Sequence, residues 1–260
     1  MKRYRFTGFF IDGTRNILRK YPAGNEKIKR WIASEFGESN FNSKLERYLA
    51  FDPPNIFVLV EYYDLLLQIA YSYVSGYFYP ALTGACCLGE RIFNMLIINL
   101  RDFYKDTNGY KKIYSKDSIQ DWNLSIDVLT EWNIIDSDLE KDYRKLGDIR
   151  NDSIHLKEMS NIPERAIEAL RCIMKITERL FGLRQDIFFM VSGEPYIRKN
   201  KENEPIVKKF LIPNCILVGH KHIIEEEFGE SVIKDTNQYE DGEVTDSEFS
   251  ELRQKWLSPR

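Results

Sequence analysis

Apolar residues recur every three or four positions through the middle of the chain, which predicts a series of helices. The first two, at 56–75 and 80–104, are apolar around most of their circumference, a pattern typical of buried helices. Amphipathic helices are expected at 118–132 and 164–181, the second closed by Gly182 as a C-cap. Between them, residues 136–138 offer an N-cap for a further helix, which carries Leu139, Tyr143 and Leu146 at helical spacing.

The two ends of the chain follow other patterns. Residues 5–11 read as a strand and 25–36 as a helix, followed by a polar stretch and a break at 51–54. Beyond Leu183 the period shortens to about two, which predicts strands at 186–192, 196–199, 206–212 and 216–222 in a small antiparallel sheet. We expect a mainly α fold, α+β overall, with four parts: an N-terminal segment (1–50), a helical bundle (51–184), a β appendage (185–224) and an acidic tail with one short helix (225–260).

Charge is distributed unevenly along the chain, although the formal net charge is only −3. Residues 1–50 hold eleven Lys or Arg against five Asp or Glu, a formal charge of +6. A basic end of this kind could meet nucleic-acid phosphates, or it could be an ordinary solvated surface. The stretch from Glu225 to Glu251 is strongly acidic.

The cysteines and histidines are not spaced like the ligands of a structural metal site. Cys86, Cys87, Cys172 and Cys215 lack the Cys-x2-Cys spacing of zinc sites and are expected to be buried, reduced thiols of a cytoplasmic protein. His220 and His222 could face one side of a strand, but no third ligand lies nearby in sequence. We therefore expect neither metal nor cofactor. The most apolar run, 92–100, is too short to cross a membrane, and the N-terminus lacks a signal-peptide pattern.

The densest cluster of reactive side chains lies in the run from Leu146 to His155. The apolar stripe of its helix leads to Ile149 and then Arg150, and charged residues rarely lie on a buried face without a partner or a function. His155 follows five residues later, about 140° around an ideal helix, whereas Asn151 and His155 can share a face. The alternative is a structural cluster in which Arg150 pairs with Asp148 or Asp152.

This stretch resembles the signature of HEPN-domain ribonucleases, in which four to six residues separate an Arg from a His and the residue directly after the Arg is usually polar. Here the matching residues are Arg150, Asn151 and His155, and the resemblance covers about residues 51–184. It implies an up-and-down helical bundle that acts as a homodimer and places two motifs in one shared cleft. HEPN proteins often carry an acidic residue where Glu90 stands, although Glu90 could equally pair with Arg91 or Asn94 at the surface.

The resemblance implies a metal-independent endoribonuclease whose substrate supplies the nucleophile, the 2′-hydroxyl of RNA. Arg150 would bind the scissile phosphate, His155 would move a proton, and Asn151 would orient one of them or the substrate. Such families often occur in toxin–antitoxin or phage-defence operons, which implies an antitoxin or regulatory protein as a further partner. The alternatives are a non-catalytic HEPN-like module that binds RNA, a nucleotide or a protein, and a purely structural helical protein.

Overall fold

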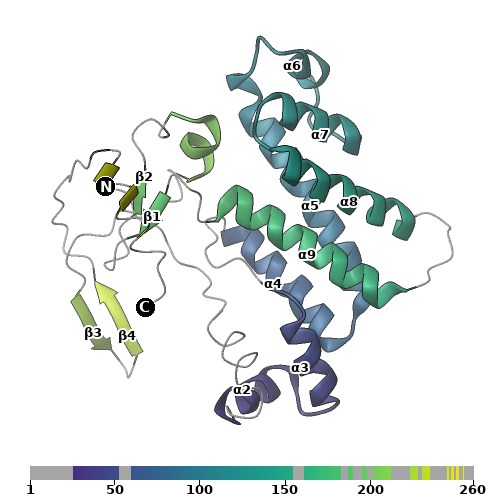
Figure 1. Cartoon of the computed structure of the whole chain (residues 1–260), viewed down its shortest axis with the longest axis vertical. Helices are drawn as coiled ribbons and strands as arrows, with labels where there is room; N and C mark the ends of the chain where they lie inside the picture. Colours follow the sequence, from purple (N-terminus) through teal and green to yellow (C-terminus); the bar gives the residue numbers. More distant parts are fainter. Residues whose placement is uncertain are drawn as a thin grey trace. The chain divides into compact units, whose positions relative to one another are not determined.

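In the computed structural model, the chain divides into two compact units: the first spans Gly8–Gly182, and the second combines Met1–Thr7 with Leu183–Arg260. The first unit is described at residues 26–52, 60–154 and 161–182, and these residues are mainly helical, as the sequence predicts (Figure 1). The second unit is described at shorter stretches: 187–189, 195–197, 201, 203–211, 223–227, 230–234, 245, 247–248, 250–251 and 254.

Helix α5 (Phe78–Leu100) is the central element of the helical unit. It packs against α4 (Val60–Ser75), α7 (Trp122–Glu131), α8 (Ser137–Ile154) and α9 (Ile162–Phe181) (Figure 1). Its apolar residues face all of these neighbours, which is why the sequence shows no polar side. The buried positions include Ala81, Leu82, Ala85, Leu88, Ile92, Phe93, Leu96, Ile97 and Leu100.

The segment Phe78–Phe103 is long and apolar enough to cross a membrane by length and composition. The run 92–100, which the sequence prediction judged too short to cross a membrane, is only part of this longer apolar segment. In the described part of the chain, 56% of its most apolar window is buried by other helices. Such burial is the ordinary condition of the core helix in a soluble protein.

The smaller helices surround this core. Helices α2 (Glu26–Phe36) and α3 (Phe41–Leu49) pack on α4, while η1 (Arg101–Phe103) and α6 (Asn108–Ile113) follow α5. The prediction of a helix at 25–36 is confirmed, whereas α3 and α6 were not predicted. Phe41, Leu45 and Leu49 do recur at helical spacing, yet α3 carries too few apolar residues to stand out from its polar surroundings.

Arg47 closes the turn between α4 and α5. It donates from Nη1 to the carbonyl oxygen of Val74, 2.9 Å away, in the last turn of α4, and its guanidinium lies 5.2 Å from the centre of the Phe78 ring. Gly76 in this turn has φ +90° and passes close to Arg47, where a Cβ would lie 2.9 Å from Nη1. The turn therefore depends on a glycine both for its left-handed backbone and for the space that Arg47 occupies.

The second unit differs from the single small sheet that the sequence predicts. Its described residues form two separate antiparallel pairs, β1 (Ile187–Phe189) with β2 (Pro195–Ile197) and β3 (Ile223–Glu227) with β4 (Glu230–Lys234). The second pair lies partly in the stretch expected to be an acidic tail. Residues 5–11 and 216–222, predicted as strands, lie outside the described residues.

The segment predicted as a strand at 206–212 is helical instead, with η3 at Val207–Leu211. Its buried residues explain the error, because Ile206, Val207 and Phe210 recur at helical spacing and do not alternate. The N–H of Lys208 donates to the carbonyl of Glu204, four positions earlier, as in an α-helical turn. Pro205 at the start of the segment has no N–H to lose, so it suits the first turn of a helix.

The cysteines agree only partly with their expected burial. Cys86 and Cys172 are buried and unpaired, whereas the adjacent Cys87 is exposed. Burial raises the pKa of Cys86 to about 12 and that of Cys172 to about 11, so both thiols stay protonated near neutral pH. Cys215 lies outside the described residues.

Tyr143 is fully buried in α8, and its ring lies 3.7 Å from that of Phe93, centre to centre. Its hydroxyl oxygen has no hydrogen-bond partner among the described residues, and burial raises its pKa well above the usual value. A buried polar atom without a partner destabilises the folded state. We expect Tyr143→Phe to leave the free energy of unfolding unchanged or to raise it by about 1 kcal/mol.

Urea unfolding of the two proteins, followed by circular dichroism, measures this difference. A loss of more than about 1 kcal/mol in Tyr143→Phe would show that the hydroxyl has a stabilising partner after all. Tyr143→Leu is the control for the ring, since it removes the contact with Phe93 and should destabilise the protein by several kcal/mol.

Candidate functional site

The site that carries Arg150 is built where α5, α7 and α8 approach closely. Gly89 of α5 and Gly147 of α8 leave the space that Trp122, the first residue of α7, fills. A Cβ on Gly147 would lie 2.6 Å from Trp122 Nε1, and one on Gly89 would lie 2.7 Å from a methyl group of Leu146. Trp122 also donates from Nε1 to the carbonyl of Tyr143 at 3.0 Å. Three helices are thus fixed against one another around one indole ring.

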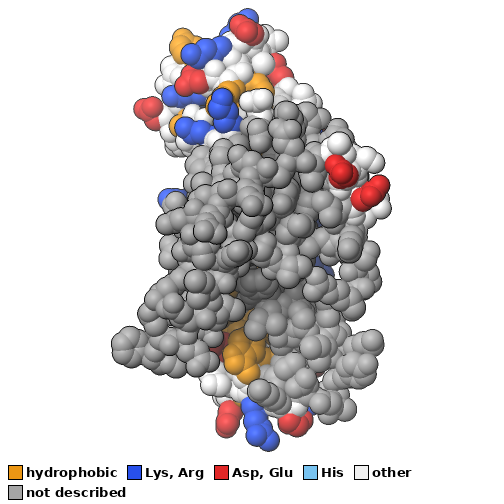
Figure 2. All heavy atoms as spheres, turned by 90° about the vertical axis from the view of Figure 1, so that its left-hand side faces the viewer, with side chains coloured by type: hydrophobic (Ala, Val, Ile, Leu, Met, Phe, Trp, Pro, Cys, Tyr) orange, Lys and Arg blue, Asp and Glu red, His pale blue; other side chains and the backbone are white. Residues whose placement is uncertain are grey.

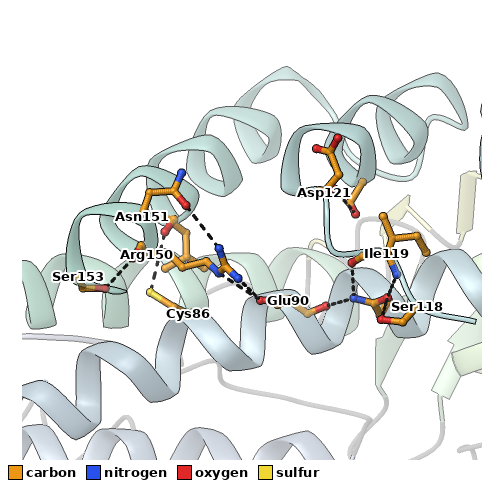
Figure 3. A network of polar contacts seen from close by, with 11 residues as sticks. Cys86, Glu90, Ser118, Ile119, Asp121, Arg150, Asn151 and Ser153 are labelled. Atoms are coloured by element: carbon orange, nitrogen blue, oxygen red, sulfur yellow. Dashed lines mark hydrogen bonds and ion pairs between the residues drawn. The ribbon is translucent and has the colours of Figure 1, made fainter. Parts of the chain in front are cut away.

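Arg150 lies near the end of α8 and reaches across to α5 (Figure 3). Its Nε donates to Glu90 Oε2 at 3.2 Å, and its Nη2 lies 3.1 Å from the same oxygen. The guanidinium carbon is 5.9 Å from the centre of the Trp122 ring, at the outer range of a cation–π contact. The Arg150 and Glu90 side chains are 25% and 32% exposed, so the pair borders the solvent.

Asn151 stands beside Arg150 on the exposed side of α8. Nη1 of Arg150 donates to Asn151 Oδ1 at 3.4 Å, a long hydrogen bond (Figure 3). The helix continues through Ser153, whose hydroxyl donates to the carbonyl of Arg150 at 2.9 Å. The structure therefore brings Arg150 and Asn151 together and adds Glu90 to them. His155, the third predicted site residue, lies outside the described residues.

Arg150 and Glu90 do not pair with the sequence neighbours that were considered as their partners. Arg150 pairs with Glu90, sixty positions away, and Asp152 pairs with Arg165. Glu90 in turn pairs with neither Arg91 nor the Asn94 amide, which donates instead to the Glu90 backbone carbonyl. Sequence neighbours were the wrong choice because the close packing of α5 and α8 decides which charges meet.

Asn94, one turn beyond Glu90, holds the chain that leads into α7. Its amide nitrogen donates to the Ile119 carbonyl at 3.1 Å, and its Oδ1 accepts from the Ile119 N–H at 2.6 Å. Asp121 then caps α7 by accepting from the N–H of Leu124 at 3.0 Å. The sequence predicted a helix that starts at 118, but α7 starts at Trp122. The Asn94 side chain bonds the backbone N–H and carbonyl of Ile119, and Asp121 caps the helix, so residues 118–121 stay outside it.

Cys86, one turn before Glu90, lines the inner side of the site. Its Sγ lies 3.9 Å from the Leu146 carbonyl, which accepts a weak S–H hydrogen bond (Figure 3). With a raised pKa, this thiol is a poor nucleophile and a structural neighbour of Arg150. The charged side chains of the site are Arg150 and Glu90, both partly exposed.

The surface elsewhere in the described ranges offers no group of three His, Cys, Asp or Glu side chains placed to hold a metal ion. The pair named from the sequence, His220 and His222, lies outside those ranges. A partly exposed ion pair such as Arg150–Glu90 stabilises a fold by at most about 1 kcal/mol.

The packing around Trp122 makes a specific prediction for Gly147→Ala. Overpacking costs about 1–3 kcal/mol, and the gain in helix propensity of about 1 kcal/mol offsets only part of it. We expect a net loss of stability in urea unfolding, and a smaller loss when Trp122→Leu is already present. The double-mutant cycle should give a coupling free energy of at least about 0.5 kcal/mol. Additive effects of the two changes would contradict the contact.

Comparisons of the chain with protein-family models, with curated protein sequences and with solved structures found no match. The interpretation of the site depends on its own residues and on the resemblance of Arg150, Asn151 and His155 to the HEPN signature.

Proposed function

We propose that the chain is a metal-independent endoribonuclease of HEPN type, with Arg150, Asn151 and His155 in its active site. One observation carries the proposal: a guanidinium that borders the solvent is held in place by Glu90 and Trp122 from two other helices. A phosphate-binding arginine has to be both accessible and preorganised, and this arrangement gives Arg150 both properties.

The hydrogen-bond inventory of Arg150 supports phosphate binding. A guanidinium has five N–H groups, one on Nε and two on each Nη. Glu90 engages Nε and Nη2, and Asn151 engages Nη1. One N–H on each Nη is left over, and both can donate to the oxygens of a phosphate.

The proposed reaction uses the nucleophile of the RNA itself. The 2′-hydroxyl oxygen attacks the adjacent phosphorus and loses its proton to a base, while the bond from phosphorus to the 5′-oxygen breaks and that oxygen receives a proton. The products are a 2′,3′-cyclic phosphate and a 5′-hydroxyl. By the resemblance, His155 moves a proton, and Arg150 stabilises the negative charge that develops on the phosphate.

The same contacts favour a second candidate function, a HEPN-like module that binds RNA, a nucleotide or a protein without cleaving RNA. Glu90 neutralises much of the charge of Arg150, and a permanent pair of this kind would weaken transition-state stabilisation. In this case Arg150 serves recognition or packing. Activity measurements on variants separate the two functions.

The working unit proposed is a homodimer with a shared cleft, because one arginine and one histidine from a single chain make a sparse active site. A groove of about 400 Å³ between α4 and α5 supports a self-interface, with Leu65, Ile69, Pro80, Cys87 and Leu88 among its lining. The remaining elements of the proposal follow from the resemblance: a cytoplasmic protein of a toxin–antitoxin or phage-defence system, controlled by an antitoxin or regulatory partner.

Arg150→Ala and His155→Ala should each reduce cleavage of a labelled RNA by at least about 100-fold, since each removes a charge or proton carrier from the transition state. Asn151→Ala should cost less, because it removes one long hydrogen bond. Arg144→Ala is the matched control: Arg144 is also on α8 and paired with carboxylates, those of Glu140 and Asp127, but lies on another face. It should cleave at the wild-type rate.

Two further conditions test the chemistry in the same assay. Cleavage should persist in excess EDTA. RNA with a 2′-methoxy group at the cut site should resist cleavage, because the methyl group blocks its nucleophile. Wild-type rates in folded Arg150→Ala and His155→Ala, or equal cleavage of the 2′-methoxy substrate, would rule out the proposed mechanism. A purified wild type that binds RNA but never cuts it would favour the binding module.

Light scattering at micromolar concentration should give a mass of about twice 30.8 kDa. If the cleft is shared, heterodimers of wild-type and Arg150→Ala chains should cleave more slowly than wild-type homodimers, because each cleft would lose one of two arginines. A monomer that cleaves RNA at the same specific rate at all concentrations would contradict the shared site.

A further inference from the structure

The end of the helical unit around η1 and α6 carries basic side chains that its own fold does not neutralise. We call residues 101–117 the α6 cap. It holds five Lys or Arg against three Asp or Glu, a formal +2 in a chain of net −3. Figure 2 shows Lys, Arg and hydrophobic side chains gathered with a few acids over the end of the unit that carries α6 in Figure 1.

Three of the four lysines of the cap are free to bind an external anion. No carboxylate among the described residues lies within ion-pair distance of Lys111, Lys112 or Lys116, and all three are exposed. The acid nearest to the start of the cap, Asp102, already pairs with Lys105 at 3.7 Å. The positive charge of this surface is thus largely available to solvent and to ligands.

Aromatic rings accompany these lysines. Phe103 is 47% exposed and Tyr114 is 57% exposed, and the ring of Tyr110 lies 5.9 Å from that of Tyr114. Cations that track a phosphate backbone, together with rings on which bases stack, are the combination that binds single-stranded nucleic acid.

Contacts with the end of α7 hold the cap in place, although α6 is too short to be a stable helix by itself. The Glu131 carboxylate of α7 accepts from the N–H groups of Asn108 at 3.0 Å and Gly109 at 2.6 Å. Next to it, Trp132 donates from Nε1 to Thr107 Oγ1 at 2.9 Å and stacks on Tyr104. A surface held in this way needs little further ordering when it binds a ligand.

The cap and the Arg150 site lie along one side of α5. Glu90, Asn94 and Arg101 fall within about 40° of one another around the helix, and Glu90 and Arg101 are about 16 Å apart along its axis. The chain between α6 and α7 is tied to this stripe, because Arg101 donates to the Lys116 carbonyl at 2.8 Å and Asn94 bonds to Ile119. A strand bound at Arg150 can therefore continue toward the cap.

We propose that the α6 cap binds the single-stranded RNA that flanks the phosphate held by Arg150, with Lys111, Lys112 and Lys116 on phosphates and Phe103 and Tyr114 under bases. The inference rests on the proposed function, and it assigns to that site its substrate class, an unpaired strand. A duplex keeps its bases stacked inside and offers no free faces to the two rings.

A membrane surface fits this cap less well. Interfacial helices present a broad apolar face to the lipid. The aliphatic residue of α6, Ile113, is fully buried in the protein, so the exposed apolar surface of the cap consists of separate rings such as Phe103 and Tyr114. We therefore assign the cap to nucleic acid and treat anionic vesicles as a competing outcome of the test.

The experiment measures binding of a fluorescent 12-nucleotide RNA, 2′-methoxy throughout so that it cannot be cut, by fluorescence anisotropy at several salt concentrations. Lys111→Gln/Lys112→Gln/Lys116→Gln should weaken binding and flatten the log–log salt slope by about 2, at about 0.7 per lost phosphate contact on a single strand. Tyr114→Ala should weaken binding roughly tenfold with little change of slope, and Tyr114→Phe should restore it.

Two matched controls exist in the same chain. Lys208 and Lys209 are adjacent exposed lysines in the second unit, and Tyr77 is 66% exposed at the start of α5. Lys208→Gln/Lys209→Gln and Tyr77→Ala should bind as the wild type does. Equal losses in controls and cap variants, unchanged binding in the cap variants, or binding of vesicles with one-third phosphatidylserine in preference to RNA would each overturn the inference.

Cleavage measured in parallel separates the two proposals. A wild type that cuts RNA while folded cap variants bind it normally ends the inference and leaves the ribonuclease intact. A wild type that binds RNA through the cap but does not cut it supports the inference and removes the proposed catalysis.

Discussion

The close approach of α5, α7 and α8 around Trp122 is the constraint on which the site depends. Two glycines, Gly89 and Gly147, provide the space, and any larger residue at either position would meet its neighbours at less than 3 Å. Because protein interiors are packed as densely as crystals of small molecules, such contacts leave little freedom in the spacing of the helices. That spacing is what allows Arg150 to reach Glu90 across the interface.

The Arg150–Glu90 pair illustrates how one contact can serve structure and chemistry together. At its partial exposure the pair adds little stability, but it limits the conformations of a long side chain that otherwise has many rotamers. A guanidinium fixed on two sides, with N–H groups left on the open side, is prepared for an anion before the anion arrives. The α6 cap repeats the principle at a larger scale, since Glu131 and Trp132 fix a short helix whose lysines face outward.

Much of the helical core could be predicted because its apolar residues recur with the period of the helix. The start of α8 and the end of α9 could be predicted from their capping residues. Asp136 accepts from the N–H of Leu139, and Gly182 ends α9 at a point where a Cβ would lie too close to the Glu178 carbonyl oxygen. Helices α3 and α6 escaped prediction because contacts from elsewhere sustain them. The strand expected at 206–212 failed because a short apolar run fits either period until its packing is known.

The sequence by itself determined the helical class of the first unit, the buried character of α4 and α5, and the presence of Arg150 and Asn151 near the end of an apolar stripe. These features depend on local periodicity and capping, which act between residues close in the chain. Only the tertiary structure decided that Glu90 is the partner of Arg150, that Trp122 lies beside both, and that the cap and the site share one side of α5. Each of these relations joins residues between eleven and sixty positions apart. Such contacts depend on how whole helices pack against one another, and no local pattern in the chain records that packing.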